Sequence, residues 1–88
     1  MQEKIDELLA TAQTEIQQSE SLSVLESLRV RYLGKKGEVT ALLKGVSELS
    51  VDQRPIMGKV INQVKRTLAD AITAQQKMLA KQAMADQL

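Results

Sequence analysis

The residues best suited to chemistry are cations around a short turn bracketed by glycines. Lys35 and Lys36 lie between Gly34 and Gly37, with helical patterns on both sides. A turn without bulky neighbours is expected to present both ammonium groups at a tip, where they can contact a polyanion. Lysine and arginine bind phosphates without reading bases, so such contacts would position a nucleic acid without identifying its sequence. The turn lacks the spacing and the preceding strand of a P-loop.

Further cations extend this candidate site through the middle of the chain. They are Arg29, Arg31, Lys44, Arg54, Lys59, Lys65 and Arg66. Each could also be an ordinary solvated charge, and Arg29 and Arg31 could simply compensate a helix dipole at its C-terminal end. Tyr32 is the one aromatic residue that could stack on a base. It falls on an apolar helix face, so we expect it to be packed, with its hydroxyl at the rim.

The charges are unevenly distributed along the chain. Residues 1–28 carry one lysine against six carboxylates, for a net −5, and residues 29–66 carry nine cations against three carboxylates, for a net +6. The basic middle could meet an anionic partner, or it could pair with the acidic first segment inside the fold. The charges alone favour neither alternative.

Composition argues against catalysis within these residues. The 88-residue chain has no histidine and no cysteine, which removes the usual general base, disulfides and most zinc sites. We therefore predict no catalytic residues, no cofactor-binding residues and no metal site in this chain. No apolar stretch approaches the roughly 20 residues of a membrane span, and the N-terminus lacks a signal-peptide pattern. The cytoplasm is the expected compartment.

Apolar spacing of three and four residues predicts four helices. They cover about residues 2–18, 21–33, 38–45 and 51–86. Ser21 and Ser23 are equally good N-caps for the second helix. Gly34 is expected to end that helix with a positive φ. Pro55 either restarts the fourth helix or is a tolerated irregularity near its beginning.

These helices predict an all-α fold, an elongated antiparallel hairpin or coiled-coil arm with one long C-terminal helix and two to three shorter ones. We expect the first helix to run antiparallel to the far half of the fourth. The Lys35–Lys36 turn would lie away from the chain ends, and the termini would lie together. Met57, Met78 and Met84 are expected to fill the core, while Gln75 and Gln76 should weaken the seam. The uncapped helical pattern at Leu88 suggests a single domain, residues 1–88, of a longer chain.

The run from Leu28 to Thr40 resembles the N-terminal coiled-coil domain of the bacterial phenylalanyl-tRNA synthetase alpha chain. The resemblance continues through Leu42-Leu43-Lys44 and Leu49, and then through Arg54-Pro55, Gly58, Asn62 and Lys65. It covers essentially the whole chain and is strongest over residues 28–72. One departure precedes Arg54, where the family commonly has Leu-Pro-Pro-Glu-Glu and this chain has Leu-Ser-Val-Asp-Gln.

The resemblance implies a helical arm that projects from an α2β2 enzyme and contacts tRNA(Phe) at the outer corner of its L shape. It implies that ATP- and magnesium-dependent aminoacylation belongs to a class II catalytic domain further along the alpha chain, with the beta chain as partner. Lys35 and Lys36 match the family's Lys-Lys turn and are the first candidates for tRNA contact. The other candidates follow as a set: Arg31, Arg29, Lys44, Arg54, Lys59, Lys65 and Arg66.

An alternative function needs no RNA. The chain could be a structural coiled-coil module that binds a partner helix or assembles oligomers, and the isolated domain could self-associate through an exposed apolar seam. An independent enzyme is contradicted by the absence of histidine and cysteine and by a length too short for a deep pocket.

Overall fold

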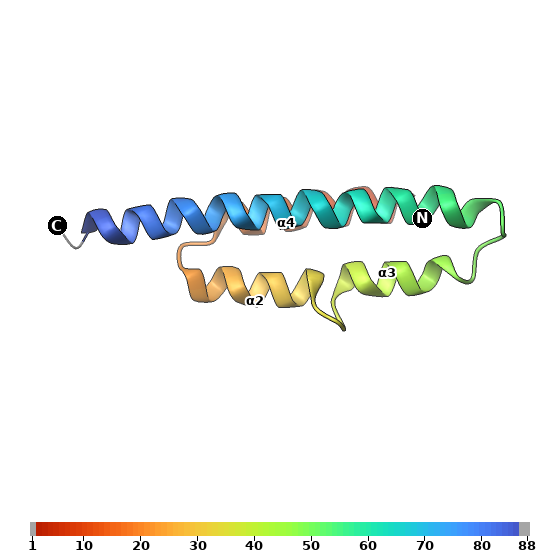
Figure 1. The fold of residues 1–88 in the computed structure, drawn as a ribbon, viewed down its shortest axis with the longest axis horizontal. Helices are drawn as coiled ribbons and strands as arrows, with labels where there is room; N and C mark the ends of the chain where they lie inside the picture. Colours follow the sequence, from red (N-terminus) through yellow and green to blue (C-terminus); the bar gives the residue numbers. More distant parts are fainter. Residues whose placement is uncertain (1, 87–88) are drawn as a thin grey trace.

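The computed structural model describes residues 2–86 and contains four helices. They are α1 (Gln2–Gln18), α2 (Leu22–Leu33), α3 (Glu38–Val46) and α4 (Gln53–Asp86). The molecule measures 57 × 18 × 16 Å, and α2 and α3 lie end to end beside the long α4 (Figure 1). The described residues include no strand. The predicted all-α, elongated fold with one long C-terminal helix is confirmed.

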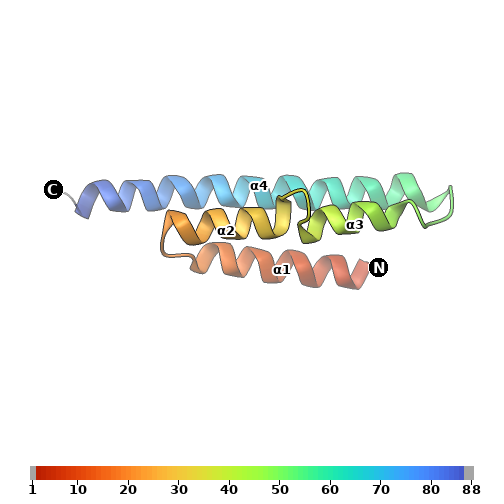
Figure 2. The same ribbon diagram turned by 90° about the horizontal axis from the view of Figure 1, so that it is seen from below.

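The direction of α1 differs from the prediction. Ile5 and Leu9 share a concavity with Val60 and Val64, near the beginning of α4. At the other end of α1, Ser19 accepts a hydrogen bond from Gln75, further along α4. The two helices therefore run parallel, and the predicted antiparallel arrangement is wrong. The reason is that α2 and α3 together act as one interrupted helix that runs antiparallel to α4. Because α1 is antiparallel to α2, it runs in the same direction as α4 (Figure 2).

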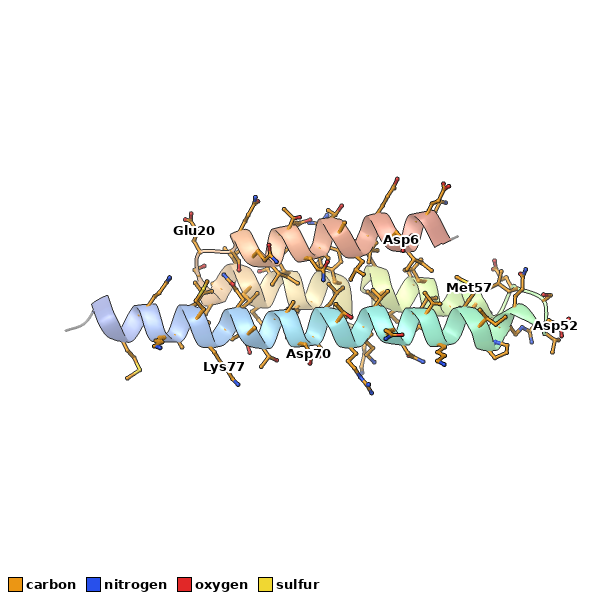
Figure 3. All side chains as sticks on the ribbon, turned by 90° about the horizontal axis from the view of Figure 1, so that it is seen from above. Asp6, Glu20, Asp52, Met57, Asp70 and Lys77 are labelled. Carbon is orange, nitrogen blue, oxygen red and sulfur yellow. The ribbon has the colours of Figure 1, made fainter. Side chains whose placement is uncertain are left out.

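This arrangement also moves the glycine-bracketed turn away from a tip. Residues 34–37 connect α2 to α3 at mid-length of the molecule (Figure 2). The tip is the turn between α3 and α4, where Asp52 is labelled in Figure 3. The beginning of α1 lies beside α4, far from the end of α4 (Figure 1). The predictions of a tip position for the lysines and of adjacent chain ends are wrong, and the pattern at Leu88 lies outside the described residues.

One continuous core joins all four helices. Its members are 8% exposed or less and, within each helix, lie three, four or seven residues apart: Ile5, Ala12, Ile16, Leu25, Leu28, Tyr32, Val39, Ile61, Val64, Leu68, Ile72 and Leu79. Such spacing places each set on one helix face, and burying that face drives the helices together. Met57 packs partly against this core, whereas Met78 is 45% and Met84 70% exposed. The prediction of core packing is wrong for these last two methionines.

The helix ends follow local chemistry. Ser21 caps α2, because its Oγ accepts a hydrogen bond from the Val24 N–H at 3.2 Å. Pro55 is the third residue of α4, where a backbone N–H would have no intrahelical acceptor, so its missing donor costs the helix little. The helix continues unbroken from Gln53 to Asp86.

Gln75 strengthens the seam that it was predicted to weaken. Its side chain is 8% exposed, and its Nε2 donates to the Ser19 carbonyl at 3.0 Å. A second, longer contact of 3.4 Å reaches the Gln17 carbonyl. The carbonyls at the end of a helix have no intrahelical donor, so this amide satisfies them while it ties the α1–α2 turn to α4.

Candidate nucleic-acid interface

The turn that carries Lys35 and Lys36 is built from two glycines in extended conformations. Gly34 has φ −68° and ψ 172°, and Gly37 has φ −73° and ψ 167°. No described glycine has a positive φ, so the prediction of a positive φ at Gly34 is wrong. Glycine is required at both positions because the backbone of the preceding helix, α2, lies too close to leave room for a side chain. A Cβ on Gly34 would lie 2.5 Å from the Val30 carbonyl oxygen, and one on Gly37 would lie 2.7 Å from the Tyr32 carbonyl.

Hydrogen bonds fasten both ends of this turn. The Gly34 N–H donates to the Val30 carbonyl at 3.0 Å, and the Gly37 N–H donates to the Gly34 carbonyl at 2.9 Å. The Thr40 hydroxyl, from the first turn of α3, donates to the same Gly34 carbonyl at 2.8 Å. The exposed Lys35 and Lys36 therefore stand on a fixed backbone, which reduces the entropy lost when they bind.

Tyr32 is part of the core and is not free to stack on a base. It is 2% exposed, and its hydroxyl donates to Glu15 Oε1 at 2.6 Å. Desolvation, together with the Glu15 carboxylate, raises the pKa of Tyr32 to about 12. The prediction that the Tyr32 ring is packed is confirmed.

Two of the nine candidate cations are paired with carboxylates. Arg31 Nη1 lies 3.3 Å from Glu15 and its Nε 3.9 Å from Glu38, and its guanidinium stands 5.4 Å from the Tyr32 ring centre. Arg29 pairs with Glu26 one helical turn earlier. Their hydrogen bond lowers the pKa of the Glu26 carboxyl. Pairing of the acidic first segment with the basic middle is thus realised at Glu15 and Arg31.

The seven other candidates are exposed. They are Lys35, Lys36, Lys44, Arg54, Lys59, Lys65 and Arg66. Within residues 2–86, no carboxylate forms a salt bridge with any of them. Arg54 is held by its Nε, which donates to the Leu49 carbonyl at 3.0 Å. Their positive charge is therefore available to an anion.

The cations of α4 lie on the side of that helix turned away from α1. Contact with α1 involves the side of α4 that carries Val60 and Thr67. Successive helix residues rotate by about 100°, so residues three or four apart lie on the same side of a helix. A row of such residues lies on the other side of the core stripe of α4: Arg54, Gly58, Asn62 and Lys65. In Figure 2 the turn 34–37 bends away from α1, and Figure 1 shows that it bulges on the side of α2 and α3 turned away from α4. We call the row 54, 58, 62 and 65 of α4, with Lys59 and Arg66 at its edge, the basic face. Lys35 and Lys36 stand on the separate α2–α3 turn.

The outer edge of the basic face is shallowly hollowed. Lys59, Asn62, Gln63 and Arg66 line a concavity of α4. Asp70 and Lys77 follow on the edge of α4 away from α1 (Figure 3). Lys44 occupies the last turn of α3, where it also compensates the helix dipole. The arrangement offers several cations and amide groups but no enclosed cavity, which suits an extended polyanion better than a small molecule.

No metal site or membrane span accompanies this face. Among the described residues, no three or more Asp, Glu, His or Cys side chains are grouped so as to hold a metal ion. None of the helices, within the part of the chain that the structure covers, is long and apolar enough to cross a membrane.

Comparison with known proteins identifies the family. The family described as aminoacyl tRNA synthetase class II, N-terminal domain, matches residues 20–88. The chain belongs to this family. Among individual relatives, the phenylalanine–tRNA ligase alpha subunit of Ectopseudomonas mendocina is 43% identical over 86 residues, which are 98% of this chain and 25% of that protein.

Other alpha subunits match over the whole chain. Those of Coxiella burnetii and Listeria monocytogenes are each 39% identical over 88 residues, which cover 27% and 25% of those proteins. The predicted resemblance to the N-terminal domain of the phenylalanyl-tRNA synthetase alpha chain is confirmed. The chain spans about a quarter of the length of these relatives.

Reasoning from the sequence missed the role of Glu15. Glu15 holds both Arg31 and Tyr32 from 16 and 17 residues away, and no local pattern signals so distant a partner. Gly58 could serve close approach of another helix to α4. A Cβ at Gly58 would meet no atom within 4 Å, so packing against another helix does not require this glycine.

Proposed function

We propose that the chain is the tRNA-binding arm of a cytoplasmic phenylalanyl-tRNA synthetase alpha chain. The observation that carries the proposal is the basic face, a set of exposed cations without carboxylate partners, in a member of a synthetase N-terminal domain family. Its partner is tRNA(Phe). The rest of the alpha chain supplies a class II catalytic domain that uses ATP and magnesium, and the beta chain completes an α2β2 assembly.

Phosphate contacts explain how such an arm would act. Each lysine or arginine that neutralises a phosphate releases condensed counterions, which supplies affinity without sequence selectivity. Lys35 and Lys36 are the first contacts, joined by Lys65, Arg66, Lys59, Arg54 and Lys44. Arg29 and Arg31 contribute less, because their charge is already shared with carboxylates. Holding the tRNA in one orientation lowers the entropic barrier to transfer of the amino acid at a distant site.

A structural role is the second candidate. Val51 is 74% and Ile56 63% exposed at the tip, and exposed apolar side chains that lie together favour contact with another protein. In that case the arm would dock a partner helix or a second copy, and the cations would only keep the surface soluble. Sedimentation over a concentration range, with and without tRNA, separates the two: a dimer indifferent to tRNA supports the structural role.

The decisive experiment removes the arm from the complete synthetase. Adenylate formation and tRNA charging are then measured separately. We expect normal adenylate formation and strongly impaired charging. The double variant K35E/K36E in the full enzyme should raise the KM for tRNA and lower its salt dependence, while K4E, at an exposed position of α1, serves as the control for a charge reversal elsewhere on the surface. Normal charging without the arm would refute the proposal.

A further inference from the structure

Gly58 is a glycine without a structural reason inside the fold. It lies in α4, six residues from the beginning of a 34-residue helix. A side chain added there would enter open space, and φ is not positive. Among residues that can continue a helix, glycine is the least favourable apart from proline. Alanine would fit this position and stabilise the helix, so the glycine is not explained by the structure of the chain alone.

The neighbours of Gly58 point to a ligand. It lies one turn after Arg54 and one turn before Asn62, with Lys65 in the same row, all on the side of α4 turned away from α1. Residues 54 to 65 extend over about 16 Å of helix. The row thus has cations at both ends and an amide between them, and at its partly buried Gly58 no side chain covers the backbone. A missing side chain allows a ligand to approach a backbone closely.

We propose that the sugar–phosphate backbone of an RNA lies directly against α4 at Gly58, with Arg54 and Lys65 binding phosphates on either side. This inference rests on the proposed function and specifies where the strand passes. A protein helix docking at the same place would need an apolar seam, whereas the row holds Arg54, Gly58, Asn62 and Lys65, and Lys59 stands beside it. Ribose and phosphate oxygens match these cations and the Asn62 amide.

The test adds volume at Gly58 without changing charge. G58A and G58L are introduced into the complete synthetase, and A10L, at an exposed position of α1, controls for added bulk. We expect G58L to raise the KM for tRNA about tenfold, equivalent to about 1.4 kcal/mol, with G58A intermediate. Adenylate formation and the A10L enzyme should remain normal. In the 88-residue chain, G58A should raise the melting temperature by roughly 4 °C.

The outcomes separate this inference from the proposed function. If K35E/K36E weakens tRNA binding but G58L does not, the strand does not pass Gly58 and the inference is overturned, while the arm keeps its proposed function. If neither variant affects tRNA, both proposals fail. If G58L instead disrupts assembly of the subunits in sedimentation, with the KM for tRNA unchanged, Gly58 contacts protein and the inference is again overturned.

Discussion

The Tyr32 hydroxyl donates a hydrogen bond to Glu15 Oε1 at 2.6 Å, and this bond joins α2 to α1 across 17 residues of sequence. The same carboxylate approaches Arg31. Glu15 therefore fixes the helix end from which the Lys35–Lys36 turn departs. A carboxylate of the acidic first segment, residues 1–28, thus holds in place two residues of the basic segment, residues 29–66.

Removing the hydroxyl should destabilise the arm. In Y32F the ring still fills the core, but Glu15 loses a donor. We expect the free energy of unfolding in urea to fall by about 1–2 kcal/mol. E15A should cost more, because it leaves the buried Tyr32 hydroxyl without its acceptor and Arg31 with only the more distant Glu38. An exposed substitution in α1, T14A, is the control. Equal stability of Y32F and the wild type would show that this bond contributes nothing.

The raised pKa of Tyr32 predicts a loss of stability in alkali. A folded-state pKa of about 12, against about 10 for an unperturbed tyrosine, means that the folded chain holds its proton more tightly. The contribution is fully present below pH 10 and is lost as pH rises toward 12. Urea unfolding at pH 9 and at pH 11.5 should differ by up to about 2 kcal/mol more in the wild type than in Y32F. Parallel losses in both proteins would contradict the assignment, since lysine titration is common to them.

The glycines of the turn should not tolerate alanine. A Cβ at Gly34 would lie 2.5 Å from a backbone oxygen that cannot move without shifting α2. We expect G34A and G37A each to lower the free energy of unfolding by about 2 kcal/mol. G58A is the matched control, because its Cβ has open space and should stabilise the chain. A G34A protein as stable as the wild type would mean that α2 and α3 can rearrange around the turn.

Arg31 and Lys35–Lys36 should differ in their effect on RNA binding. R31Q removes a charge already shared with Glu15 and Glu38, so we expect a stability loss below about 1 kcal/mol and little change in the salt dependence of tRNA affinity. K35Q/K36Q should instead reduce the slope of log affinity against log salt by about 2. Affinities measured between 50 and 200 mM salt test both expectations. A larger slope change for R31Q would show that Arg31 leaves its carboxylates to bind phosphate.

The helices could be predicted from sequence because each depends on neighbouring residues. Apolar spacing in segments such as Ile5 to Ile16 and Ile61 to Ile72, the cap at Ser21 and the breaks at Gly34 and Gly37 are local signals. The class of candidate site followed from composition in the same way, since the absence of histidine and cysteine and the cluster of cations need no coordinates. The four predicted helices are confirmed, with bounds close to those in the structure, whereas the class of site stays a prediction.

The sequence by itself thus determined four helices, an elongated all-α fold and a basic middle suited to a polyanion. Only the tertiary structure decided that α1 runs parallel to α4 and that the Lys35–Lys36 turn lies at mid-length. It also decided that Glu15 pairs with Arg31, whereas Arg54, Lys59, Lys65 and Arg66 form no salt bridge with a described carboxylate. The physical reason is that helix direction and long-range pairing depend on how apolar faces combine. An apolar stripe can bury itself against either direction of a neighbouring helix, and only the complete packing of α2 and α3 against α4 selects one.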